Sequence, residues 1–87
     1  MLKGRRMNEE KPQTLKQCVS EALEEYLSQV EQEHISDLYN MVLGEVEAPM
    51  LEVVMKHARS NQSKAAAMLG LNRGTLRKKL RQYKLID

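Results

Sequence analysis

Residues 61–87 read NQSKAAAMLGLNRGTLRKKLRQYKLID and carry the clearest helix and turn signals of the chain. The first residue of this stretch, an asparagine, is a suitable N-cap for a short helix of strong helix formers at 62–69. Gly70 supplies the positive φ that ends such a helix. Asn72 can cap a second helix over roughly 73–83. The stretch therefore predicts two short helices joined by a tight turn of about three residues.

The spacing of small and apolar residues in this stretch matches the helix-turn-helix motif. Counted from Gln62 as the first position, the fifth, ninth, tenth and fifteenth positions hold the expected residue types: Ala66, Gly70, Leu71 and Leu76. The small residue lets the two helices cross closely, and the two leucines fill the angle between them. One position departs, because the eighteenth, usually apolar, is Lys79. We interpret this departure as a slightly altered helix register.

The second helix of the motif separates apolar from cationic residues. Its predicted inward stripe is formed by three residues at helical spacing: Leu76, Leu80 and Tyr83. A stripe of four cations lies away from the leucines: Arg73, Arg77, Arg81 and Lys84. Arginine can pair bidentately with guanine in a major groove, and asparagine, threonine and lysine suit phosphate or base contacts. We expect residues near the start of this helix to read bases.

Charge is divided sharply along the chain. Residues 1–55 carry five basic and eleven acidic side chains, a net charge of −6, whereas residues 56–87 carry nine basic and one acidic, a net charge of +8. This division indicates a scaffold with a cationic surface for a polyanion. A membrane is disfavoured because the chain has no Trp or Phe to enter headgroups, and base stacking on RNA is disfavoured by only three Tyr. A merely solvated basic face is the alternative.

A polar arm and two longer helical segments precede the motif. Residues 1–12 are polar and predict a flexible arm. Thr14 and Gln17 fit a capping box, which predicts an amphipathic helix over 15–32. Ser36 is the expected N-cap of a second helix that runs to about Arg59.

Twelve of the eighteen residues at 38–55 are apolar, and they do not keep to one stripe. A helix that is apolar nearly all round is buried nearly all round, and this short chain cannot enclose it. We therefore expect a second copy to complete the core. Pro49 removes a backbone donor, so we expect either one helix with a kink there or two helices that meet there. Because apolar residues continue on both sides of Pro49, we favour the single kinked helix.

Composition argues against several classes of function. One Cys and two His offer no metal-binding cluster, and we expect no cofactor. A helical chain with four Gly and few aromatic residues has little means of enclosing a catalytic pocket, so we expect no enzyme. No apolar run approaches the roughly 18 residues of a membrane span, and no leader opens the chain, so we expect a cytoplasmic protein.

The segments LYNMVLGEVEAPML and NQSKAAAMLGLNRGTLRKKL resemble the Fis family, the factors for inversion stimulation of bacterial nucleoids. The resemblance covers residues 38–84 and, more loosely, the chain from residue 12 onward. It implies an all-α fold of intertwined homodimeric four-helix subunits with a C-terminal helix-turn-helix. It also implies a nucleoid-associated global transcription regulator that binds degenerate sites in the major groove of double-stranded DNA and bends it. The C-terminal segment resembles the DNA-binding domain of sigma-54-dependent activators of the NtrC type as well.

The family's site positions can be carried over to this sequence. Positions that contact bases correspond to Asn72, Arg73 and Arg77. Positions that contact phosphates correspond to Asn61, Ser63, Thr75, Lys78, Lys79 and Arg81. A surface that touches RNA polymerase corresponds to Lys56, Arg59, Ser60 and Gln62.

The implied organisation is a flexible arm at 1–12, dimerisation helices at 13–60 with a kink near Pro49, and a DNA-binding unit at 61–87. Because only about a dozen residues precede the first helix, we expect the recombinase-activating arm of this family to be missing. Two alternatives stay open. One is a helical dimerisation and interaction module whose basic tail docks an acidic protein, and the other is the DNA-binding domain of a sigma-54-dependent activator.

Overall fold

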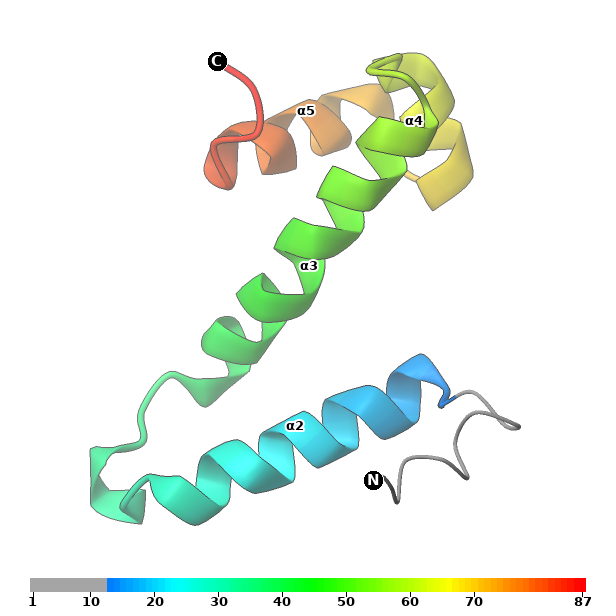
Figure 1. The fold of residues 1–87 in the computed structure, drawn as a ribbon. Coiled ribbons are helices and arrows are strands. Elements are labelled where there is room, and N and C mark those ends of the chain that lie inside the picture. Colours follow the sequence, from blue (N-terminus) through cyan, green and yellow to red (C-terminus); the bar gives the residue numbers. More distant parts are fainter. Residues whose placement is uncertain (1–12) are drawn as a thin grey trace. The chain divides into compact units, whose positions relative to one another are not determined.

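The structure is a computed structural model that describes residues 13–87, so the arm predicted at 1–12 lies outside the described residues. The elements in chain order are α2 (Leu15–Gln29), a short 3₁₀ helix η1 (Gln32–His34), α3 (Leu38–His57), α4 (Gln62–Leu69) and α5 (Arg73–Gln82) (Figure 1). Residues 13–87 contain no strand, which confirms the all-α prediction. No helix in this range combines the length and apolarity needed to cross a membrane.

The chain divides into two compact units, of which the first ends at Ser36 and the second is Asp37–Asp87. The second unit holds α3, α4 and α5, so the long helix belongs structurally with the helix-turn-helix. The division predicted at residue 60 separates dimerisation from DNA binding. It is functional rather than structural, and it stays a prediction.

Helix α2 begins as its capping box predicts. The Gln17 N–H donates to Thr14 Oγ1 at 3.1 Å, and the Thr14 N–H donates to Gln17 Oε1 at 2.8 Å. The helix ends at Gln29 rather than near residue 32, because Val30 adopts an extended backbone and the chain then forms the turn η1. No residue of α2 is buried.

Helix α3 is one continuous helix through Pro49, which excludes the alternative of two separate helices (Figure 1). Its N-cap is Asp37 rather than the expected Ser36, and its last residue is His57 rather than about Arg59. Asp37 has a left-handed backbone with φ 56°, and its carboxylate accepts from Asn40 Nδ2 at 2.9 Å instead of capping a backbone N–H. The sequence did not predict Asp37 as the N-cap, because its carboxylate bonds the Asn40 side chain and does not make the usual capping bond to a backbone N–H.

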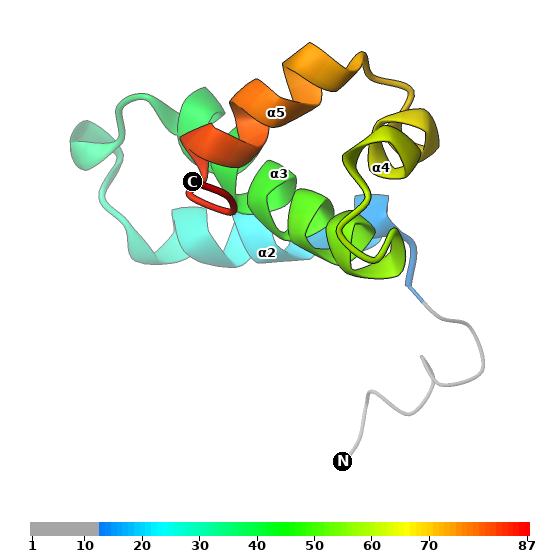
Figure 2. The same ribbon diagram turned by 90° about the horizontal axis from the view of Figure 1, so that it is seen from above.

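The two caps predicted for the helix-turn-helix are present. Asn61 Oδ1 accepts from the Lys64 N–H at 3.0 Å at the start of α4, and Asn72 Oδ1 accepts from the Thr75 N–H at 3.1 Å at the start of α5. Figure 2 shows α4 beside the C-terminal end of α3 and α5 lying across α3. The residues buried at the centre of this unit are Leu51, Ala58, Ala65, Ala66, Leu76 and Leu80. The predicted inward stripe on α5 is therefore confirmed for both leucines, and Tyr83 is half-buried beside them.

Left-handed residues reverse the chain after all three helices of the second unit. They are Arg59 after α3, Gly70 after α4 and Lys84 after α5, with φ 54°, 74° and 58°, and after α3 a second left-handed residue, Ser60, follows with φ 64°. In each case the next residue donates its N–H to a carbonyl five residues earlier: Ser60 to Met55, Leu71 to Ala66, and Leu85 to Leu80. Only Gly70 reaches this conformation without a Cβ, as predicted from its place in the turn.

Candidate nucleic-acid interface

The first turns of α4 and α5 form one exposed polar surface, held together by side-chain hydrogen bonds. Arg73 Nη1 donates to Ser63 Oγ at 3.4 Å, and Arg77 Nη1 donates to Gln62 Oε1 at 3.2 Å. Each bond links residues on different helices, and all four residues were selected from the sequence. The structure thus brings two of the predicted base-reading residues together with predicted phosphate and polymerase contacts.

Asn72, the third predicted base-reading residue, is the N-cap of α5. The cap uses the side-chain oxygen, whereas the amide NH₂ group carries the two donors that a base or phosphate acceptor requires. The start of α5 also carries the positive end of the helix dipole and backbone N–H groups that favour an anion. Asn72 and Arg73 therefore stand where a negatively charged ligand is best accommodated.

The predicted phosphate contacts differ in exposure. Five of them are exposed and lie on α4, on α5 or at the start of α4: Asn61, Ser63, Thr75, Lys78 and Arg81. Lys79 is different, because its side chain is only 31 % exposed. Its ammonium is bonded to a carboxylate of α3, which the sequence did not predict.

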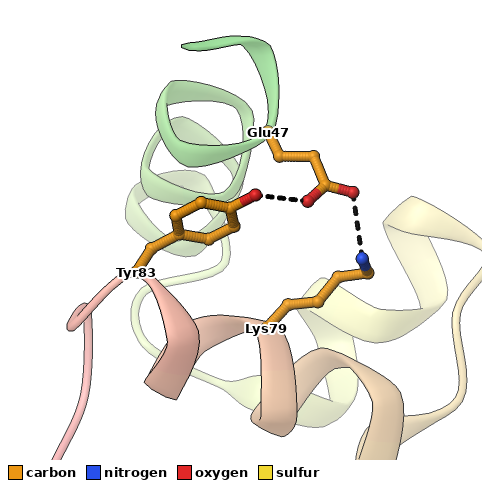
Figure 3. A network of polar contacts seen from close by, with 3 residues as sticks. All are labelled: Glu47, Lys79 and Tyr83. Carbon is orange, nitrogen blue, oxygen red and sulfur yellow. Dashed lines mark hydrogen bonds and ion pairs between the residues drawn. The ribbon is translucent and has the colours of Figure 1, made fainter. Parts of the chain in front are cut away.

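Glu47 of α3 is the centre of this unforeseen contact, shown in Figure 3. Lys79 Nζ donates to Glu47 Oε2 at 2.9 Å, and the Tyr83 hydroxyl donates to Glu47 Oε1 at 2.6 Å. The Glu47 side chain is 18 % exposed. The hydrogen bonds from Tyr83 and Lys79 lower the pKa of Glu47, and the bond to Glu47 raises the pKa of Tyr83. Both shifts favour an ionised carboxylate beside a protonated phenol near neutral pH.

This network also explains the departure from the helix-turn-helix pattern at Lys79. A lysine can occupy a usually apolar position because its aliphatic stem tolerates partial burial while its charge reaches Glu47. The sign of this contact in the sequence is the lysine at position 79, where the motif usually has an apolar residue. Its partner could not be found from spacing, because Glu47 precedes Lys79 by 32 residues.

The residues matched to a polymerase surface lie at the corner between α3 and α4. Lys56 is in the last turn of α3, and Gln62 is the first residue of α4. Between them, Arg59 and Ser60 are both left-handed, with φ 54° and 64°, and the turn is closed by a 3.0 Å bond from the Asn61 N–H to the Ala58 carbonyl. Arg59 and Ser60 are exposed at this corner.

Every charged side chain of residues 61–86 is cationic. Residues 61–86 contain seven Lys and Arg side chains and no Asp or Glu. With two short helices, a tight glycine turn and this charge, the second unit defines a helix-turn-helix protein.

Comparison with known proteins places the chain within that class. The profile of the family described as bacterial regulatory protein, Fis family, matches residues 42–83. The chain is 58 % identical over 74 residues to a Fis-like DNA-binding protein of Pseudomonas aeruginosa, an alignment that covers 85 % of this chain and 71 % of the relative. It is 56 % identical over 69 residues to the DNA-binding protein Fis of Aeromonas hydrophila, covering 79 % and 70 % of the two chains.

A third relative, the DNA-binding protein Fis of Histophilus somni, is 55 % identical over 69 residues, with the same shares of the two chains covered. The chain belongs to the Fis family. Membership in a family of bacterial regulatory proteins agrees with the sequence argument against an enzyme.

Proposed function

We propose that this protein is a DNA-binding and DNA-bending regulator, which acts as a homodimer on degenerate sites of the bacterial nucleoid in the cytoplasm. The observation that carries the proposal is the joint surface of α4 and α5, where Arg73 and Arg77 are held by α4 at the start of a cationic helix. Relatives more than half identical to this chain are named DNA-binding proteins. The proposal places α5 in the major groove as the recognition helix.

The roles follow from position and chemistry. Asn72, Arg73 and Arg77 read base edges, because they lie in the first turns of α5 and include arginines suited to guanine. The exposed residues Asn61, Ser63, Thr75, Lys78 and Arg81 hold phosphates. Lys79 matches a phosphate-contacting position as well, but its ammonium already bonds Glu47.

Dimerisation is supported by apolar side chains on α3 that this chain leaves exposed. Tyr39 is 75 % exposed and Val53 54 % exposed. Exposed apolar surface of this kind is typical of protein interfaces. A dimer presents two recognition helices, and DNA that must bend to meet both is selected by its deformability as well as by base contacts.

A contact with RNA polymerase is part of the same proposal. The exposed corner of Arg59 and Ser60, with Lys56 on one side and Gln62 on the other, would carry it. Gln62 also bonds Arg77, so this corner adjoins the proposed base-reading surface.

The test is gel mobility on circularly permuted duplexes with an AT-rich centre flanked by guanine and cytosine, titrated with salt. We expect a discrete complex whose mobility depends on the position of the site and whose affinity falls steeply with salt. Position-independent retardation would remove the bend. An absence of retardation, with salt-tolerant binding to an acidic protein, would support the interaction module instead.

Arg73→Ala tests the assignment of base contacts. We expect it to weaken binding to a duplex selected by the wild-type protein by about 1–3 kcal/mol, with a smaller effect on a shuffled duplex. The matched control is Lys16→Ala, which removes one exposed positive charge from α2. If Arg73→Ala kept the full preference for the selected duplex, the assignment of which α5 residues face the bases would be wrong.

A further inference from the structure

We infer that Glu47 positions the recognition helix α5 by holding Lys79 and Tyr83, and that Lys79 serves this contact instead of a DNA phosphate. The inference rests on the proposed function, since it concerns how α5 is presented to DNA. It assigns to a residue of the long helix α3 a part in sequence preference, although Glu47 is an acid and cannot itself attract DNA.

The geometry of the contact is that of a two-point clamp. Each oxygen of one carboxylate accepts a bond from α5, at 2.9 Å from Lys79 and 2.6 Å from Tyr83. Lys79 and Tyr83 are four residues apart and so lie one above the other on the same face. Two bonds separated by one helical turn oppose both rotation and tilt of α5, which a single bond would not do.

The apolar contacts of α5 cannot replace this clamp. Leu76 and Leu80 are fully buried and hold α5 in the unit. Burial of apolar surface is non-directional, however, and it tolerates small rotations of a helix about its own axis. Side-chain tips lie about 6 Å from a helix axis, so a rotation of roughly 10° moves the ends of Arg73 and Arg77 by about 1 Å. A shift of that size is enough to weaken bidentate bonds to a base.

The surroundings of Lys79 favour the clamp over a phosphate contact. The Lys79 and Glu47 side chains are only 31 % and 18 % exposed, and bonds between ionised groups at this exposure are stronger than those on an open surface. Transfer of the ammonium to DNA would leave a largely buried carboxylate without its cation, close to a polyanion. The neighbouring Lys78 is exposed and carries no such cost.

The experiment compares two adjacent lysines in the full-length protein. Lys79→Met and Lys78→Met each remove one charge and keep an unbranched stem. Binding is measured against salt on the selected duplex and on its shuffled counterpart. We expect Lys78→Met to reduce the slope of log affinity against log salt by about 1 and to weaken both duplexes alike. We expect Lys79→Met to leave that slope unchanged and to reduce the preference for the selected duplex about threefold to tenfold.

Two further variants test the clamp from its other members. Glu47→Gln removes the charge at the centre, and Tyr83→Phe removes one hydroxyl while keeping the ring that packs in the unit. We expect both to reduce the preference for the selected duplex, with Tyr83→Phe about threefold and without loss of helical circular dichroism. Tyr83→Phe is therefore informative even if Glu47→Gln impairs folding.

The outcomes separate the clamp from the proposed function. A reduced salt slope in Lys79→Met with an unchanged preference would show a phosphate contact and overturn the inference. An unchanged preference in both Glu47→Gln and Tyr83→Phe would overturn it as well. If the wild-type protein bound neither duplex, or if Arg73→Ala left the preference intact, the failure would lie with the proposed function.

Discussion

Arg59, Ser60 and Lys84 hold a left-handed backbone conformation that side chains with a Cβ seldom adopt. For such residues this conformation costs about 1 kcal/mol or more, and Gly avoids the cost. The helix ends need it nevertheless, because one left-handed residue lets the chain turn back and satisfies carbonyls of the last turn. The residues that close α3 and α5 are therefore held in place by the bonds formed around them.

Replacement of Lys84 by glycine should stabilise the protein. Lys84→Gly relieves the left-handed strain and keeps the 2.8 Å bond from the Leu85 N–H to the Leu80 carbonyl. We expect the free energy of unfolding to rise by about 0.5–1 kcal/mol, measured by urea denaturation at fixed protein concentration. The control is Arg81→Gly in the last turn of α5, where the backbone is helical, which should lower it by up to about 1 kcal/mol. A loss of stability in Lys84→Gly would show that its side chain, and not its backbone, matters at this end.

Some residues of the site could be predicted from near neighbours in the sequence, and others depend on contacts between helices far apart in the sequence. Asn61, Gly70 and Asn72 were predicted in their exact roles, because a cap or a left-handed turn depends on residues within a few positions. Glu47 was not predicted, because its contacts on α5 depend on how α3 and α5 pack. The sequence marked only one end of that contact, the lysine at a position usually apolar.

At the scale of elements, the number and order of the helices from residue 15 onward were predictable from periodicity and capping. Their ends were less so. The first helix stops at Gln29 although its polar and apolar pattern continues to residue 32, because Val30 and the turn η1 redirect the chain. Pro49 was recognised as a disturbance, but only the structure decides that α3 continues through it.

Helix α5 uses Asn72 for two tasks that one substitution can separate. Asn72→Asp keeps a side-chain oxygen for the Thr75 N–H and adds a negative charge at the positive end of the helix. We expect thermal stability to be unchanged or slightly higher, by about 0.5 kcal/mol. DNA affinity should fall at least about tenfold, since the amide donors are lost and a charge is turned toward phosphates.

Thermal unfolding and gel mobility of the same Asn72→Asp preparation test this separation. Asn72→Ala is the comparison, because it should lower both stability, by about 1 kcal/mol, and DNA affinity. Retention of full DNA affinity by Asn72→Asp would exclude a role of the Asn72 amide at the interface.

At the scale of the whole molecule, the described chain buries little apolar volume. The buried apolar set contains three leucines and three alanines, while large side chains such as Tyr39, Met50 and Val53 remain at least 42 % exposed. A chain of 87 residues with so small a core is marginal by itself. This imbalance is the physical reason to expect a second copy.

Stability should therefore depend on protein concentration. We expect the thermal midpoint to rise by several degrees over about a hundredfold increase in concentration, because association favours the folded chain by mass action. Val53→Glu should lower the midpoint and shift sedimentation equilibrium toward monomer, whereas Glu52→Gln, which removes a charge at the adjacent exposed position, should do neither. A concentration-independent midpoint with a monomeric mass would exclude the dimer.

The continuity of α3 has a consequence for the mechanics of the proposed complex. A helix of 20 residues is a rod of about 30 Å, and this one carries exposed apolar side chains along its length and Glu47 near its middle. In a dimer assembled on α3, the separation of the two recognition helices is set by a continuous helix and not by a flexible linker. The bend angle of the DNA is then set by the geometry of the protein dimer. A change of DNA sequence alters how readily the duplex bends to that angle, but not the angle itself.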